Sequence, residues 1–145
     1  MINNSKEIIP GLCIGSSTDS NITGNIININ KSFKNDKLNI LNLELDLNKI
    51  YLKDKLHTEK INFEKINNFI LESYNKNEKI TIFSDDIMIS LIICIQFLIK
   101  YIDVNVIEST YYVCKKTNID IAILPKVQVF ELFNFYINNI DKSID

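Results

Sequence analysis

The sequence predicts an α/β fold in which helices flank a central mixed sheet in three layers. Two observations lead to this fold class. Short segments of strand character precede the helical ones, and an apolar strand, Ile80 to Ile82, leads directly into a long apolar helix, Ile87 to Ile99. The chain has 145 residues, no internal repeat and no linker rich in Gly, Pro or Ser. We therefore expect one domain over residues 1–145.

The first half of the chain favours strands. Two short strands are expected over Glu7 to Gly15, joined by a tight turn at Pro10-Gly11. The small polar residues of Ser16 to Asn21 suit a brief helical turn. Further strands are predicted over Asn25 to Asn30 and over Leu38 to Leu45, because apolar and polar residues alternate there.

The second half favours helices around one buried strand. The segment Leu47 to Lys60 has no clear apolar period, and we expect a surface loop there that carries His57, the only histidine. Helical spacing of apolar residues predicts helices over Ile61 to Tyr74, Val106 to Lys116 and, after Pro125, Lys126 to Ile140.

The turn between the apolar strand and the apolar helix is Ser84-Asp85-Asp86. Unpaired backbone amides and the positive end of a helix dipole meet at such a turn, so it is a common place for anion chemistry. Here the turn carries two carboxylates of its own. Asp85 or Asp86 is therefore expected to act as the N-cap of the helix, where its charge replaces that of a bound anion.

Composition excludes several classes of function. A net charge of −2 with scattered lysines gives no reason to expect nucleic-acid or membrane binding. All 16 cationic side chains are lysine, so the chain contains no arginine. The three cysteines are widely spaced and not paired as metal ligands, which predicts reduced core thiols and a cytoplasmic protein. The N-terminus does not have the pattern of a signal peptide, Ile87 to Ile99 is too short to span a membrane, and no cofactor or metal is expected.

The opening segment Ile8-Ile9-Pro10-Gly11-Leu12-Cys13-Ile14-Gly15-Ser16 resembles the start of dual-specificity protein tyrosine phosphatases, including poxviral members. The order of later segments is similar too: Ile26 to Asn30, Leu41 to Asp46, Ile61 to Tyr74, Ile80 to Tyr101 and Tyr111 to Leu132 follow the family's strands and helices. The resemblance implies a dual-specificity phosphatase-like fold. The abundance of Asn, Ile and Lys indicates an AT-rich genome, as many poxviruses have.

The catalytic signature of that family is His-Cys, five residues, then Arg and Ser or Thr. The cysteine thiolate attacks phosphorus, and the arginine holds the phosphate oxygens bidentately. In register with it, the chain replaces every essential residue: Phe83 stands for histidine, Ser84 for cysteine, Ile87 for glycine, Ser90 for arginine and Leu91 for the hydroxyl residue.

No other register restores the signature. Asp19, Lys100 and Asp120, not arginine, lie six residues after Cys13, Cys94 and Cys114, and lysine offers only a point charge. A like charge about 4 Å from a phosphate dianion costs several kcal/mol at an effective dielectric near 20, so Asp85 and Asp86 oppose its binding. We expect no catalytic residue and no enzymatic activity.

The remaining candidates carry less weight. Asp46 falls near the family's general-acid position, but without a phosphoenzyme it is expected to be an ordinary loop residue. His57 has no partner for a metal site or a triad. Of Tyr111 and Tyr112, one is expected to pack inward, and a role of the pair in a protein interface is the alternative.

Three functions follow from these residues. The first is a non-catalytic pseudophosphatase that binds a host or viral protein partner through a surface that the sequence does not identify, with a homodimer as a further possibility. The second is a phospho-residue-binding module with a remodelled pocket. The third, an enzyme of unrelated chemistry, has no supporting set of residues.

Overall fold

The computed structural model describes residues 5–15, 24–30, 38–46 and 53–124; for residues 53–60 it describes the backbone alone. The predicted helix over Lys126 to Ile140 and the helical turn over Ser16 to Asn21 lie outside these ranges. Within them, the elements are β1 (Lys6–Ile9), β2 (Leu12–Ile14), β3 (Asn25–Ile29), β4 (Asn39–Leu43), α1 (Lys53–Asn75), β5 (Ile80–Ser84), α2 (Ile87–Ile102), α3 (Val106–Thr117) and the short 3-10 helix η2 (Ile121–Ile123).

The five strands form one mixed sheet, as the sequence predicts, and the structure gives their order as β1-β2-β5-β3-β4. The β1–β2 pair is antiparallel and turns at Pro10-Gly11, where Gly11 adopts a left-handed φ of 87° that favours glycine. The other three pairings are parallel. Because β3 runs parallel to both β4 and β5, the carboxyl ends of these three strands meet at one edge of the sheet.

Asparagine side chains join β3 to β4, at the edge of the sheet opposite β1. The Asn39 side-chain amide donates to Asn25 over 3.0 Å, and that of Asn28 donates to Asn42 over 2.9 Å. Both β3 residues are buried, so these bonds give partners to the Asn25 side-chain oxygen and the Asn28 side-chain nitrogen, which would otherwise be costly in the interior. The abundance of Asn in these two strands therefore has a structural use.

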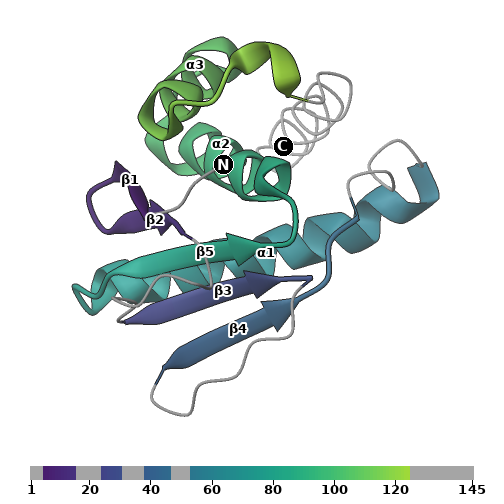
Figure 1. Ribbon diagram of the computed structural model, residues 1–145. Helices are drawn as coiled ribbons and strands as arrows, with labels where there is room; N and C mark the ends of the chain where they lie inside the picture. Colours follow the sequence, from purple (N-terminus) through teal and green to yellow (C-terminus); the bar gives the residue numbers. More distant parts are fainter. Residues whose placement is uncertain (1–4, 16–23, 31–37, 47–52, 125–145) are drawn as a thin grey trace.

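The main core lies between one face of the sheet and the three helices. Alternate strand residues such as Leu12, Ile27 and Ile82 pack there with apolar side chains of α1, α2 and α3. Figure 1 shows α2 leaving the carboxyl end of β5 and α3 stacked on α2. The opposite face of the sheet is buried as well, through residues such as Ile26 and Phe83. The architecture is the predicted α/β sheet flanked by helices.

One segment was assigned wrongly from the sequence. The structure continues α1 back to Lys53, so residues 53–60 and His57 belong to a helix and not to a surface loop. The segment lacks an apolar stripe, but five of its eight residues are Lys, Leu or Glu and none is Gly or Pro, which favours helix on propensity alone. This helix ends at Asn75, before a turn at Asn77 with a φ of 56°, close to the predicted end at Tyr74.

Candidate functional site

The candidate site is the turn from β5 into α2, at the carboxyl edge of the sheet. Asp86 is the N-cap of α2, as one of the two predicted aspartates was expected to be. Its carboxylate oxygen Oδ1 accepts from the Met88 amide over 3.0 Å, and its backbone carbonyl accepts from the Ile89 amide over 3.0 Å. Oxygens of Asp86 thus accept hydrogen bonds from two amides that would otherwise be available to a bound anion.

Two further residues of the turn, Phe83 and Asp85, are fixed by contacts with the sheet. The Asp85 amide donates to the Ile29 carbonyl of the neighbouring strand over 3.3 Å, while the Asp85 side chain is exposed. Phe83, at the histidine position, is fully buried on the sheet. An added Cβ on Gly15 would lie only 2.9 Å from the Phe83 ring, so glycine is required for this ring to pack.

Ser84 and Ser90 stand at the cysteine and arginine positions, and their hydroxyls contact each other. The two Oγ atoms are 2.6 Å apart, and the Ser84 hydroxyl also donates to the Asp86 carbonyl over 2.6 Å. Since a hydroxyl has one proton, Ser90 is the donor in the serine pair. Ser90 is 1% exposed, and Leu91 beside it lies in the core. Hydrogen bonds therefore run from the Ser90 hydroxyl to the Ser84 hydroxyl and on to the Asp86 carbonyl within the turn.

This geometry gives Ser84 no general base. Its proton is directed at a backbone carbonyl, which does not accept protons in catalysis, and the Ser90 hydroxyl is a donor to it. Ile87 opens the helix and is partly buried against the core. No chemistry of the cysteine–arginine type follows from these side chains.

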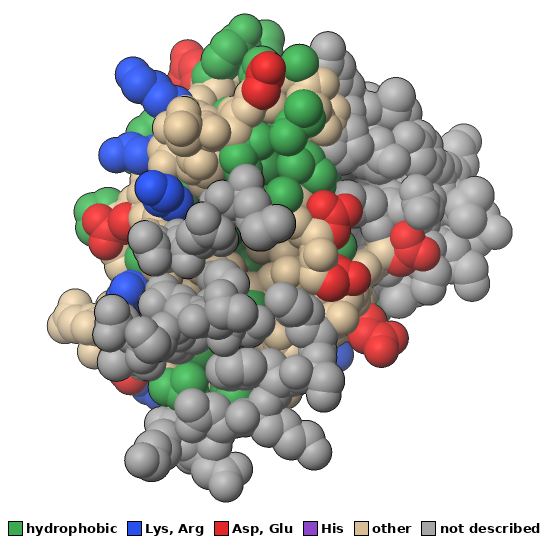
Figure 2. Space-filling view, viewed as in Figure 1, with side chains coloured by type: hydrophobic (Ala, Val, Ile, Leu, Met, Phe, Trp, Pro, Cys, Tyr) green, Lys and Arg blue, Asp and Glu red, His purple; other side chains and the backbone are tan. Residues whose placement is uncertain are grey.

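Asp46, the predicted counterpart of the general acid, lies at the same edge. The chain before it is fixed by Asn30, whose side chain accepts from the Leu45 amide over 2.9 Å and donates to the Leu45 carbonyl over 2.7 Å. Because β3, β4 and β5 run parallel, Asp46 follows the carboxyl end of β4 as Asp85 follows that of β5. Figure 2 shows acidic side chains gathered at this edge, on the right of the view. Their charge disfavours a phosphate dianion there.

The three cysteines do not supply an alternative nucleophile. All three are buried and free, in agreement with the expected core thiols. Burial raises the pKa of Cys94 and also raises the pKa values of Cys13 and Cys114, so the thiols stay protonated near neutral pH. Among the described residues, no group of three or more His, Cys, Asp or Glu side chains could hold a metal ion.

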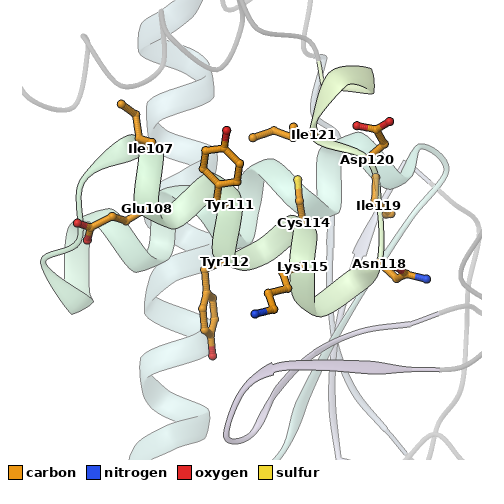
Figure 3. A pocket seen from close by; sticks show the side chains of 10 residues that line it. All are labelled: Ile107, Glu108, Tyr111, Tyr112, Cys114, Lys115, Asn118, Ile119, Asp120 and Ile121. Atoms are coloured by element: carbon orange, nitrogen blue, oxygen red, sulfur yellow. The ribbon is translucent and has the colours of Figure 1, made fainter.

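The expectation for the tyrosine pair was wrong in one respect. Neither side chain packs into the core: Tyr111 is 60% exposed and Tyr112 is 40% exposed. The Tyr112 hydroxyl donates to the Ile8 carbonyl over 2.7 Å, which fixes the ring beside β1. Together with Ile107 and Ile121 the pair borders a groove of about 890 Å³ beside α3 (Figure 3). The sequence did not predict the groove, because its second wall is formed by residues 118–121, which fold back beside α3.

Comparison with known proteins identifies the fold. No protein-family model and no curated protein sequence matches the chain. Among solved structures, a leucine rich repeat and phosphatase domain containing protein from Entamoeba histolytica is similar, with a TM-score of 0.72 and 20% identity over 98% of this chain and 96% of that one. Human tyrosine phosphatase-like serine/threonine/tyrosine-interacting protein has a TM-score of 0.71 and 17% identity over 95% of this chain and 99% of that one.

A variant of human DUSP28 has a TM-score of 0.73 at 10% identity, and the match covers 97% of this chain and 98% of that one. At these identities the matches establish a shared fold. The chain therefore has the dual-specificity phosphatase-like fold that the resemblance implied. None of the helices in the described part of the chain is long and apolar enough to cross a bilayer.

Proposed function

We propose that this chain is a pseudophosphatase, a non-catalytic protein of the phosphatase fold that works by binding another protein. The observation that carries the proposal is the contact of Ser84 with Ser90, 2.6 Å between hydroxyl oxygens. The side chains at the nucleophile and phosphate-clamp positions bind each other, and neither has the chemistry of cysteine or arginine.

Three further facts support the absence of catalysis. The sequence contains no arginine, so no residue can clamp a phosphate bidentately. Asp86 accepts hydrogen bonds from the Met88 and Ile89 amides in the first turn of α2. The cysteines are buried with raised pKa values and are poor nucleophiles.

The binding role rests on what the fold keeps. Its core and sheet are intact, while the catalytic turn has been replaced residue by residue. One protein of similar structure is named as phosphatase-like and as an interacting protein, which fits the same division between fold and chemistry. Resemblance of the opening segment to poxviral phosphatases and the bias toward Asn, Ile and Lys are the basis for proposing a viral protein that meets its partner in the host cytoplasm.

Two measurements on the purified protein test the proposal. Hydrolysis of para-nitrophenyl phosphate is expected to equal the uncatalysed rate and to be the same for the protein and its Ser84→Ala variant. Turnover that disappears in Ser84→Ala would overturn the proposal. The second measurement is partner capture from cell lysate, which is expected to be unchanged after the lysate is treated with a phosphatase. If treatment abolishes capture, the chain is a phospho-residue-binding module instead.

A further inference from the structure

The outer face of α3 carries a stripe of four residues that we call the α3 stripe: Glu108, Tyr111, Tyr112 and Lys115. All four side chains are exposed. Their spacing is i, i+3, i+4 and i+7, which places them along one face of a helix. Among the described residues, neither Glu108 nor Lys115 makes a side-chain ion pair. The stripe therefore has two aromatic rings near its middle, one directed to each side of the helix, and a charge of opposite sign at each end.

The order of the stripe is self-complementary. A two-fold axis midway between Tyr111 and Tyr112 that sets two copies of α3 antiparallel exchanges Tyr111 with Tyr112 and Glu108 with Lys115. Each tyrosine then faces the other tyrosine of the second copy, and each charge faces its opposite. A parallel arrangement would instead oppose Glu108 to Glu108 and Lys115 to Lys115.

Helix polarity favours the same arrangement. Glu108 lies in the first turn of α3 and Lys115 in the last. In an antiparallel pair, the positive end of one helix dipole approaches the negative end of the other, so both dipoles and side-chain charges attract. Electrostatic complementarity of this kind fixes register and orientation in helix pairs.

The surface beside the stripe has an apolar character that is typical of an interface. Ile107, which lines the groove described above, is 62% exposed, and Ile123 at the end of η2 is 58% exposed. Figure 2 shows hydrophobic side chains gathered over the upper part of the molecule, where Figure 1 places α3 and η2. Figure 3 shows Tyr111 and Tyr112 pointing to opposite sides of the helix, with Glu108 toward one end and Lys115 toward the other.

Tyr112 is held in place before any partner arrives. Its hydroxyl is bonded to the Ile8 carbonyl, and the Lys116 ammonium lies 5.6 Å from its ring centroid. A ring fixed in this way loses little conformational entropy on association, and tyrosine is among the residues that contribute most to interfaces.

From this pattern we infer that the α3 stripe is the interface of a homodimer in which a second copy of the chain packs its own α3 antiparallel across it. The inference rests on the proposed function, since it names one surface and one partner through which a binding protein would act. Dimerisation itself requires nothing of the Ser84 turn, so the two statements can fail separately.

Charge reversal tests the pairing directly. Sedimentation equilibrium of the full chain is expected to show a monomer–dimer equilibrium. Glu108→Lys or Lys115→Glu alone turns both symmetric ion pairs into repulsions and should weaken the dimer by about tenfold or more. The double variant, Glu108→Lys with Lys115→Glu, restores opposite charges across the axis and should recover the affinity of the original chain. Tyr111→Ser should weaken the dimer without recovery by charge reversal.

A matched control lies on α1. Lys65 and Glu72 are exposed, have the same spacing of seven residues and carry the same two charges. Lys65→Glu and Glu72→Lys are therefore expected to leave the dimer unchanged. A chain that stays monomeric, or a dimer that the α3 single variants leave intact or the double variant fails to recover, overturns the inference. A monomer that still captures a partner leaves the proposed function standing, whereas phosphatase turnover in a chain that dimerises through α3 overturns only the proposed function.

Discussion

Asp86 combines two tasks at the level of a single residue: it caps α2 and supplies the negative charge at the helix N-terminus. Asp86→Ala removes the acceptor of the Met88 amide and is expected to lower the free energy of unfolding by about 0.5–2 kcal/mol. Asp86→Asn keeps a side-chain oxygen and should retain most of that stability. Urea denaturation with a common m-value measures both.

Asp85→Ala is the matched control for this prediction. The Asp85 side chain is exposed, and the hydrogen bond to Ile29 is made by its backbone amide. Its free energy of unfolding should stay within about 0.5 kcal/mol of the original. Equal losses from the two alanine variants would show that the capping assignment is wrong.

The buried thiols predict how stability depends on alkaline pH. Burial raises the pKa of Cys94 in the folded chain above the value of about 8.5 expected after unfolding. Below that pH the thiol is protonated in both states, so the stability is fully present. At higher pH the unfolded chain loses the proton and the folded chain keeps it, which lowers the free energy of unfolding.

Stability should therefore fall as the pH rises from 8 to 10, as followed by urea denaturation at each pH. Cys13 and Cys114 add to the decline, because burial raises their pKa values too. Cys94→Ala is expected to be less stable at every pH but to show a shallower decline. A free energy of unfolding that is constant or rises over this interval would mean that the thiols are accessible.

At the level of the element, a buried amide pair joins α1 to α2. The Gln96 side chain donates to Asn67 over 2.6 Å, and that of Asn67 donates to Gln96 over 2.9 Å. Gln96→Leu leaves the Asn67 amide buried and unpaired, so we expect a loss of about 1–3 kcal/mol. The double variant, Asn67→Leu with Gln96→Leu, removes both polar groups and should recover part of that loss. Strictly additive losses in this double-mutant cycle would contradict the pairing.

Elements with a strong apolar period were predictable from the sequence. The strand β5 and the helix α2 stand out because ten consecutive residues of α2, Ile89 to Leu98, are buried. The start of α1 was not predictable in this way, since residues 53–60 have helix-forming side chains without an apolar stripe. Apolar periodicity finds only helical segments that carry an apolar stripe in their sequence.

The orientation of α3 shows a second limit. Its buried face is made largely of small polar residues, among them Ser109 and Thr117, and hydropathy does not mark such a face as buried. Their hydroxyls are satisfied by backbone carbonyls: Ser109 donates to Ile95 over 3.0 Å, and Thr117 donates to Val113 over 2.9 Å. Both tyrosines are consequently turned outward, which the sequence did not predict.

The sequence proposed the residues of the candidate site, and the structure confirms one of its expectations, the capping aspartate, as Asp86. Register with the phosphatase signature located Ser84 and Ser90, and capping preference pointed to an aspartate at the helix start. The bond between the two serine hydroxyls spans six residues across a turn and the first turn of a helix. Only the backbone path from β5 into α2 brings them together, and that path is fixed by the sheet.

At the level of the whole molecule, the chain has a phosphatase-like fold, and the carboxyl edge of its sheet is acidic. Glu44, Asp46, Asp85 and Asp86 lie on the segments that follow β4 and β5. Their charges and the engaged amides of α2 act in the same direction, against an anion. Exposed apolar side chains of the described residues include Ile107, Tyr111 and Tyr112 on α3, so we propose binding there and not at the carboxyl edge of the sheet.

Isothermal titration of the purified chain with orthovanadate, a phosphate analogue, tests the central claim most directly. We predict no heat of binding and no change in melting temperature at millimolar vanadate, because protein groups already occupy the anion position. Saturable binding of vanadate to the original chain would contradict the account.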